Sequence, residues 1–249
     1  MNGELAAGDI AAIERSTLAG VQPQALEDLQ GWLLGLDDGT VGRAHSAVPL
    51  SHTAPPEGLL PAIAARYTAH GLAPVVRVPR KPAYDAFRAQ LAGEGFHASK
   101  PTLAQTGTVA AMARVGPTDG VTLAVQPDAH WAGVFMGEGF DPADGESRMA
   151  ILRRSPHNLF ASAWLDGKVA AVGSASFAHG WVGVHGMRTA PAQRGRGLAG
   201  RILAALAQEA QRRGFERAVL QVEEPNTGAQ ALYRRAGFST AWAYEYWLR

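Results

Sequence analysis

The sequence predicts an α/β (α+β) protein built from two similar halves, and three observations support this prediction. Apolar runs typical of strands alternate with amphipathic helical runs along the chain. A strand-like run at 181–189 leads through a glycine-rich turn into a helix. The rhythm of helix, glycine, aromatic residue and strand also occurs twice. At 249 residues the chain is long enough for one large or two small domains, each with its own core.

The first half predicts two helices with a strand between them. Helical spacing of apolar residues covers 63–72 and 84–91, and the apolar run 74–78 separates them. Gly71 and Gly95 punctuate the two helical runs 24 residues apart.

A turn-rich segment at 116–120, with a Gly-Pro and an Asp-Gly pair, marks the expected domain boundary. It divides the chain into an N-terminal domain of 1–115 and a catalytic domain of 116–249. Three elements are expected early in the second domain: a strand at 121–125, a helix at 146–154 and a hairpin around Asp166-Gly167.

The end of the second domain predicts the element order most clearly. Residues 181–189 are typical of a strand with small residues interspersed. Apolar residues then follow at i, i+4 spacing from Leu198 to Ala210, which indicates an amphipathic helix that Gly214 ends. A further strand is expected at 218–223.

The turn before that helix has the composition of an anion site. Gly195, Gly197 and Gly200 leave the backbone without side chains, so peptide N–H groups can approach a ligand closely. The first turn of a helix leaves N–H donors unpaired at the positive end of its dipole. Arg194 and Arg196 add charge suited to phosphate oxygens. The segment therefore predicts a pyrophosphate site.

These glycines also satisfy the dinucleotide fingerprint G-x-G-x-x-G, with Glu223 and Glu224 at about the expected acidic position. In that fold, however, the first glycine follows the strand directly, whereas 190–194 intervene here. A dinucleotide-dependent oxidoreductase is thus a remote alternative.

The segment instead resembles motif A of the GNAT superfamily of acyl-CoA-dependent N-acyltransferases, whose signature is Q/R-x-x-G-x-G/A. Its defined positions are filled by Arg194, Gly197 and Ala199. The partner motif N-x-x-A-x-x-L-Y-x-x-x-G-F is filled by Asn226, Ala229, Leu232, Tyr233, Gly237 and Phe238. The resemblance is close over 182–238 and looser back to Val121. It implies two GNAT-like halves, each a mixed, mostly antiparallel twisted sheet flanked by helices.

The first half is similar to a degenerate copy of this fold. Counting back from Gly71 as from Gly214 places Ser51, Ala54 and Pro56 where the second half has the motif A residues. Tyr84 and Leu91 then stand opposite Asn226 and Tyr233. The first half is therefore expected to lack a phosphate site and to have a structural or substrate-shaping role.

The resemblance implies acetyl-CoA, or another acyl-CoA, as co-substrate, with an amine acceptor that is a small molecule or a peptide. The residues expected to bind the cofactor are Met187, Arg188, Thr189, Arg194, Gly195, Arg196, Gly197, Leu198, Ala199, Gly200, Asn226 and Tyr233. Among these, the Met187 N–H would bind the thioester carbonyl, and Tyr233 would protonate the departing thiolate. Strand 181–189 is expected to splay from strand 218–223 and leave room for the pantetheine arm.

The general base is left open by the sequence. Where the family often has a glutamate, four residues before Met187, this chain has Gly183. His185 is expected on the same strand face as Gly183 and Met187, because side chains alternate with period two along a strand, and its ordinary pKa of about 6.5 suits a base. Glu223, at the end of the neighbouring strand, could act through water. The residues His130, His157, His179 and Trp181 are further candidates for the acceptor pocket.

Composition restricts the function classes. The absence of cysteine excludes disulfides, thiolate metal sites and a cysteine nucleophile. A net charge of +1 with no basic block gives no sign of nucleic-acid or membrane-surface binding. No apolar run is long enough to span a bilayer, and no signal-peptide pattern is present, so a cytoplasmic protein without a metal is expected. The oligomeric state is undetermined.

Two other functions fit the same motifs. The missing strand glutamate would suit a non-catalytic acyl-CoA sensor or interaction module. A pyrophosphate site is equally compatible with acyl transfer to a hydroxyl group.

Overall fold

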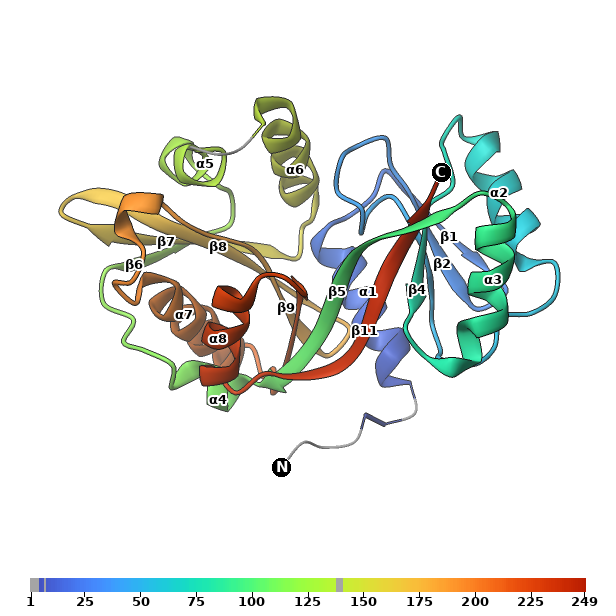
Figure 1. Ribbon diagram of the computed structural model, residues 1–249. Coiled ribbons are helices and arrows are strands. Elements are labelled where there is room, and N and C mark those ends of the chain that lie inside the picture. The colour runs from blue at the N-terminus through green and yellow to red at the C-terminus, as the bar shows by residue number, and fades with distance from the viewer. Residues whose placement is uncertain (1–4, 7, 138–140) are drawn as a thin grey trace.

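The computed structural model describes residues 5–6, 8–137 and 141–249. Eleven strands form one sheet in the order β1-β2-β3-β4-β11-β5-β10-β9-β8-β7-β6 (Figure 1). The strands are β1 Ala25–Leu29, β2 Trp32–Leu36, β3 Ala47–Pro49, β4 Val76–Pro79, β5 His97–Thr108, β6 Val121–Ala124, β7 Asn158–Leu165, β8 Lys168–Ala178, β9 Trp181–Thr189, β10 Arg217–Glu223 and β11 Ser239–Leu248. The helices are α1 Asp9–Gly20, α2 Leu59–Ala69, α3 Asp85–Gly93, α4 Val109–Ala113, α5 Ala129–Phe135, α6 Pro142–Arg154, α7 Leu198–Arg212 and α8 Thr227–Arg235, with 3-10 turns at Pro82–Tyr84 and Pro191–Gln193.

The predicted α/β class is confirmed, and the local elements lie close to where the sequence placed them. The strand expected at 181–189 is β9, and that at 121–125 is β6. In the hairpin between β7 and β8, Asp166 and Gly167 have φ values of 51° and 74°, the left-handed pair that a two-residue turn requires. No helix of the described residues is both long and apolar enough to cross a membrane.

The C-terminal half is a sheet with helices on both faces. Helices α5 and α6 lie over one face, while α4, α7 and α8 lie on the other (Figure 1). Helix α7 buries its apolar stripe, including Ile202 and Leu206, against Ala171, Val182 and Val184 of the sheet. Burial of this stripe fixes the start of α7 close to the end of β9.

The two halves are joined by an exchange of strands. Strand β11, the last of the chain, pairs antiparallel with β4 and β5 of the N-terminal half. Strand β5 pairs antiparallel with β10 of the C-terminal half. The last strand of each half therefore completes the sheet of the other, and β5 and β11 cross the middle of the molecule (Figure 1).

The repeat predicted from the glycine spacing is visible in matching helix ends. Helices α3 and α8 each contain nine residues. The Phe96 N–H donates to the Leu91 carbonyl at 3.0 Å, and the Phe238 N–H donates to the Tyr233 carbonyl at 2.9 Å. Tyr84 and Asn226 are the N-cap residues of these helices, so they occupy the equivalent positions that counting gave them.

One part of the predicted correspondence is wrong. Helix α2 has 11 residues and α7 has 15, so counting back from the glycine after each helix places the loop before α2 one helical turn out of register. Gly58 (φ 76°) is the N-cap of α2 and Gly197 (φ 75°) that of α7. The counterpart of Gly197 is thus Gly58, and not Ala54. The residues before Gly58 are Pro55, Pro56 and Glu57.

Helix α1 packs against strands of both halves. Its Ile13 packs with Ala104, Trp181 and Val219, which come from both halves. The Ala19 carbonyl at its end accepts a hydrogen bond from Ser155 Oγ at 2.6 Å. Gly20, the last residue of α1, lies so close to β9 that a Cβ on it would be 2.1 Å from Nε2 of His185.

Helix α1 also carries half of a buried ion pair. Glu14 Oε2 lies 3.0 Å from Arg77 Nη1 of β4, and the two side chains are only 3% and 1% exposed. Burial raises the pKa of Glu14, while the Arg77 charge opposes that rise. The guanidinium of Arg77 also lies 5.6 Å from the ring centre of Tyr244 in β11. The pair therefore holds α1, β4 and β11 in one arrangement.

Candidate active site

The loop before α7 forms an exposed concave site at the start of that helix. It encloses about 290 Å³ between Thr189, the residues 193–200 and the α8 residues Leu232 and Arg235. No side chain caps the first turn of α7, so its N–H groups lack intrahelical partners. Positive charge is supplied here by Arg194, Arg196 and Arg235, which line the space. Burial and then the nearby charge of Arg194 lower the pKa of Arg188 on β9. The arrangement suits a phosphate group.

The three glycines of this loop have different surroundings. Gly195 (φ 80°) and Gly197 (φ 75°) have left-handed backbones, and a Cβ on either would meet no atom within 4 Å. They therefore face open space where a ligand can lie against the backbone. A Cβ on Gly200 would instead contact the Val115 carbonyl at 3.5 Å. Gly200 therefore faces the backbone at Val115 at an ordinary contact distance and not open space, and the Leu198 side chain is buried in the core.

Between β9 and β10 the sheet opens. The parallel pairing covers 182–184 of β9 and 218–220 of β10 and goes no further. The following residues of both strands line a cavity of about 370 Å³. They are His185, Gly186, Met187 and Arg188 on β9 and Gln221, Val222 and Glu223 on β10. The splay expected between these strands is present.

A β-bulge changes the facing of β9 inside this cavity. Gly186 (φ 60°) and Met187 together stand opposite Gly173, because the β8–β9 register shifts there. A Cβ on Gly173 would lie 2.4 Å from Met187 Sδ and 3.0 Å from Ile202 of α7. His185 lies on the opposite face, against α1. The expectation that His185 and Met187 share a face is therefore wrong, since the bulge breaks the alternation.

Tyr233 lies in α8 and lines the same cavity. Its side chain is buried, and burial raises the pKa of its hydroxyl to about 12. The ring also packs edge-on against Phe238 at 6.1 Å between centres. Tyr233 therefore stays protonated at neutral pH while its ring serves the core.

Asn226 combines a structural contact with a place at the cavity. Its Oδ1 accepts a hydrogen bond from the Ala229 N–H at 3.1 Å and so caps α8. The residue also lines the cavity between β9 and β10. The cap residue therefore places the start of α8 beside this cavity.

His185 is held in a closed polar cluster. Arg43 Nη1 lies 3.3 Å from Nδ1, and Ser176 Oγ lies 3.1 Å from Nε2. Because arginine can only donate, Nδ1 accepts and Nε2 carries the proton. Burial, and then the charge of Arg43, hold the pKa of His185 well below 6.5. The imidazole is thus neutral, and its lone pair is already engaged by Arg43.

This cluster explains why the chain has glycine at position 183. A Cβ on Gly183 would lie 2.6 Å from Ser176 Oγ and 2.8 Å from His185 Nε2. A glutamate at this position would collide with both groups. The carboxylate that does reach the cavity belongs to Glu223, which is exposed at the end of β10.

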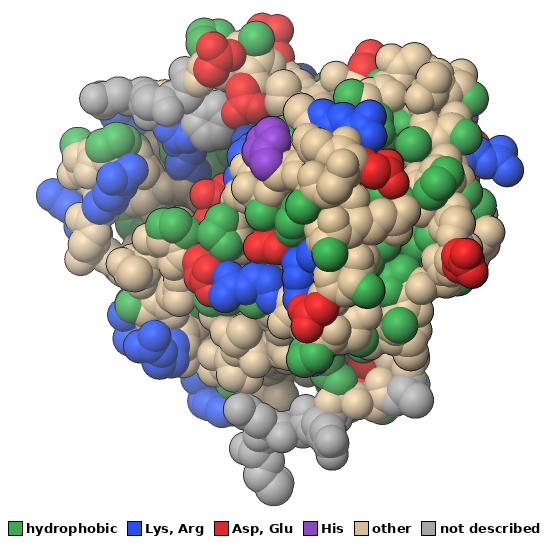
Figure 2. Space-filling model, turned by 45° about the vertical axis from the view of Figure 1, so that its right-hand side comes forward, with side chains coloured by type: hydrophobic (Ala, Val, Ile, Leu, Met, Phe, Trp, Pro, Cys, Tyr) green, Lys and Arg blue, Asp and Glu red, His purple; other side chains and the backbone are tan. Residues whose placement is uncertain are grey.

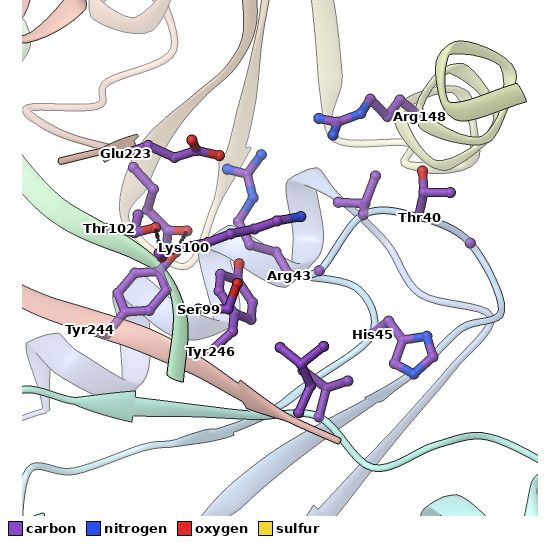
Figure 3. Close-up of a pocket in the computed structure, with 16 residues that line it drawn as sticks. Thr40, Arg43, His45, Ser99, Lys100, Thr102, Arg148, Glu223, Tyr244 and Tyr246 are labelled. Carbon is purple, nitrogen blue, oxygen red and sulfur yellow. Dashed lines mark hydrogen bonds between the residues drawn. The ribbon is translucent and has the colours of Figure 1, made fainter. Parts of the chain in front are cut away.

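A second cavity, of about 330 Å³, adjoins the cavity between β9 and β10. The two cavities share five residues: Val41, Arg43, Arg148, Gln221 and Glu223. Its wall combines the N-terminal loop 39–45, β5, β11 and α6 (Figure 3). On the face of the molecule seen in Figure 2, Lys and Arg side chains lie beside Asp and Glu side chains. The N-terminal half therefore builds much of this cavity.

Sequence reasoning missed the polar residues of this second cavity. They include Thr40, Arg43, His45, Ser99, Lys100, Thr102, Tyr244 and Tyr246. None of the proposed pocket residues His130, His157, His179 and Trp181 lines either cavity in the described part of the chain. The one local signal was Pro101, because proline inside a central strand marks a bulge. The described residues contain no cluster of three His, Asp or Glu side chains that could hold a metal.

Comparison with known families identifies one match over nearly the whole chain. Residues 7–247 match the family described as "Probable histone acetyltransferase Rv0428c C-terminal". A curated relative, "Uncharacterized N-acetyltransferase YobR" of Bacillus subtilis (strain 168), is 29% identical over 123 residues, or 49% of this chain and 50% of that protein. The match to this relative thus spans about half of its length.

Solved structures share the architecture. A GCN5-related N-acetyltransferase from Kribbella flavida superposes with a TM-score of 0.70 at 20% identity, over 98% of this chain and 96% of that one. A tandem GNAT protein from the clavulanic acid biosynthesis pathway gives a TM-score of 0.61 at 17% identity, over 95% and 87%. These similarities establish the fold, including its tandem arrangement.

Proposed function

The chain belongs to this acetyltransferase family and has a tandem GNAT fold, and on that premise we propose that it transfers an acyl group from acyl-CoA to an amine. The observation that carries the proposal is a series of three spaces that leads from the start of α7, through the opening between β9 and β10, to the boundary of the two halves. They are the α7 loop with its free N–H donors, the gap between β9 and β10, and the cavity between the halves. Such a series suits a long nucleotide thioester at one end and an acceptor at the other.

The residues of the α7 loop fit the diphosphate of coenzyme A. Gly195 and Gly197 leave open space against the backbone, and the first-turn N–H groups of α7 are unpaired. The exposed guanidinium groups of Arg194 and Arg196 supply charge. In this proposal the pantetheine arm lies in the gap beside Met187, Arg188 and Thr189.

The chemistry is direct attack in a ternary complex. An alkylammonium group is mostly protonated at neutral pH, so it must lose a proton before its nitrogen attacks the thioester carbon. The Met187 N–H, on the unpaired edge of β9, would donate to the carbonyl oxygen as negative charge develops. The C–S bond then breaks, the thiolate takes a proton from Tyr233, and the second proton of the attacking nitrogen passes through water to restore the tyrosine hydroxyl.

Glu223 is the base we favour over His185. Its carboxylate lines both cavities, so a proton from the acceptor can reach it directly or through water. The lone pair of His185 accepts from Arg43, and the lowered pKa of this imidazole makes it a weak base. His185 instead positions Arg43 at the junction of the two cavities.

The acceptor is a small-molecule amine or a lysine of a peptide. The family description names histone acetylation, which suggests the peptide class. The cavity between the halves, of about 330 Å³, suits the small-molecule class.

A non-catalytic acyl-CoA sensor is the second candidate, and Gly183 favours it, because the family's usual strand carboxylate is absent. A thiol-release assay with acetyl-CoA and a panel of amines separates the two functions. An enzyme releases coenzyme A only when an amine is present. Binding of acetyl-CoA by calorimetry without thiol release from any amine would leave the sensor.

The same assay tests the base. Glu223→Gln should lower kcat by about 10²-fold, in the range of general-base catalysis, with unchanged acetyl-CoA affinity. His185→Gln should lower kcat much less. The opposite ranking would assign the base to His185.

A further inference from the structure

We propose that the acceptor is a small amine that also carries an anionic group, a carboxylate or a phosphate, held by Lys100 and Arg43 while Glu223 receives the ammonium group. This inference rests on the proposed acyl transfer and names its substrate class. It is based on the backbone at Lys100, on the charges of the cavity between the halves, and on the position of Glu223.

Lys100 has a strained backbone inside a strand. It is one of four described non-glycine residues with positive φ, and its value is 49°. The other three, Gln30, Asp166 and His179, each precede a glycine in a tight hairpin turn. Lys100 instead lies in β5, before Pro101, where the β5–β11 register shifts. Strain of this kind is found at functional sites, where it aims a side chain.

The bulge turns the Lys100 side chain into the cavity. In Figure 3 Lys100 reaches across the space between the central strands and α6, and Arg43 and Arg148 also point into it. The Thr102 hydroxyl donates to the Lys100 carbonyl at 2.8 Å and supports the bulged backbone. An exposed lysine with an unfavourable backbone conformation thus contributes an ammonium group to this cavity.

The cations of the cavity exceed its carboxylates. Arg43, Lys100 and Arg148 line it, and Glu223 is the one carboxylate among the described lining residues. Arg148 is already paired with Asp144 at 2.8 Å. None of the ion pairs within 4 Å in the described part of the chain includes Arg43 or Lys100, and the charge of Lys100 acts only at longer range on Asp144, where it helps to lower the pKa of the carboxyl. An anionic group on the ligand would form charge-assisted hydrogen bonds with these two cations.

Glu223 gives the ligand a direction. It lies where the cavity between the halves meets the gap between β9 and β10, on the side of Tyr233 and Met187. The ammonium end of the ligand therefore belongs at Glu223, next to the thioester. Its anionic end belongs at Lys100, on the N-terminal side. A peptide rich in lysine would place further positive charges against Arg43 and Lys100, which opposes binding.

Matched acceptor pairs in a thiol-release assay with acetyl-CoA test this inference. Each pair shares an amine and differs in one anionic group: an amino acid against its primary amide, and phosphoethanolamine against ethanolamine. Rates are compared at equal concentration of the unprotonated amine, and a lysine-rich peptide forms a third arm. We expect kcat/KM to be at least about tenfold higher for the anionic member of one pair, and the pair that shows it identifies carboxylate or phosphate.

The variant Lys100→Gln shows whether the preference arises at this residue. It should raise KM for the anionic acceptor about tenfold or more, with little change in kcat and none in KM for the neutral partner. Lys100→Arg should restore much of the lost affinity because it keeps the charge. Lys168→Gln, an exposed lysine at the start of β8 that lines neither cavity, is the control and should change nothing.

The outcomes separate this inference from the proposed function. Equal or better turnover of neutral amines or of the lysine-rich peptide, unchanged by Lys100→Gln, overturns the anionic acceptor and leaves acyl transfer standing. Acetyl-CoA binding without turnover of any amine overturns acyl transfer, and the anionic acceptor with it.

Discussion

The loops before α2 and α7 share a backbone geometry and differ in chemistry. Both helices start after a glycine of nearly equal left-handed φ, Gly58 at 76° and Gly197 at 75°. The residues before Gly197 are Arg194, Gly195 and Arg196, which supply N–H donors and positive charge. Before Gly58 stand two prolines, which have no N–H, and Glu57, whose carboxylate repels an anion. A copy of this fold can therefore keep its turn and lose its ligand.

The lost ligand site does not make the N-terminal half dispensable. Its loop 39–45 and strand β5 wall the cavity in which we place the acceptor. Its β4 and β5 are also the two partners of β11. We infer that the C-terminal half binds the acyl donor and that the N-terminal half shapes the acceptor site.

The largest expected effect follows from the strand exchange. A chain that lacks residues 1–115 loses β5, which lies between β10 and β11, together with β4. Strand β11 then has no neighbour, and the apolar faces of Trp242 and Tyr244 are exposed. We expect residues 116–249 alone to be insoluble or to lack a cooperative thermal transition by calorimetry. A fragment that unfolds cooperatively as a monomer would show that the halves are independent domains.

The sequence predicted the local elements better than their assembly. Short-range signals placed β9, the start of α7 and the turn at Asp166-Gly167, because periodicity and turn residues act over a few positions. The exchange of β5 and β11 depends on pairing between distant residues, which no local pattern encodes. The bulge at Gly186 likewise turns Met187 to the other face of β9, and the glycine itself is the only local sequence signal for this bulge.

The candidate site shows the same contrast between residues predicted from local motifs and residues that only the tertiary structure brings together. The residues proposed to bind the acyl donor come from two motifs, each continuous in sequence, and they lie around one pair of spaces. The cavity proposed for the acceptor is assembled from a loop, strands and a helix far apart in sequence. Arg43 and Lys100 therefore became visible only in the folded chain.

The second prediction compares the two glycines directly. Gly197→Asp should weaken coenzyme A binding by about 100-fold or more, which is about 2.7 kcal/mol, because it places a carboxylate where the diphosphate is expected. Gly58→Asp is the matched control, since it strains an equivalent backbone without touching that site. Calorimetry on the intact chain should give one site in the wild type and in the control. Equal loss in both variants would trace the effect to strain, and two sites per wild-type chain would contradict the inactive first copy.

The third prediction uses a tyrosine from each half. Tyr233→Phe keeps the ring but removes the proton, so kcat should fall by about 10²-fold with acyl-CoA affinity unchanged. Tyr84→Phe removes a hydroxyl that donates to the Ser51 carbonyl at 2.8 Å. That control should lower the free energy of unfolding by about 1 kcal/mol and leave kcat alone. Equal kcat in Tyr233→Phe, where chemistry limits the rate, would make Tyr233 a core residue only.

The smallest expected effect is the acid sensitivity that two histidines, the buried His185 and the half-buried His52, give to the folded protein. Burial lowers the pKa of His185 in the C-terminal half well below 6.5, and that of His52 in the N-terminal half to about 4. Each is neutral in the folded state and gains a proton on unfolding once the pH falls below 6.5. Stability from each is thus complete above pH 6.5 and is lost as the pH falls, by at most about 1.4 kcal/mol per pH unit for His185.

Urea unfolding between pH 7 and pH 3.5 measures this loss for both histidines. The contribution of His52 should level off near pH 4, where its folded form also takes up a proton. The contribution of His185 should be lost as the pH falls below 6.5 for as long as its imidazole stays neutral, because burial and then the charge of Arg43 oppose its protonation. His185→Gln should therefore flatten the acid slope below pH 6.5, and His52→Gln should flatten it between pH 6.5 and about pH 4. An unchanged slope in His185→Gln would mean that its imidazole is protonated in the folded protein, and Arg43 would then have to turn away from Nδ1.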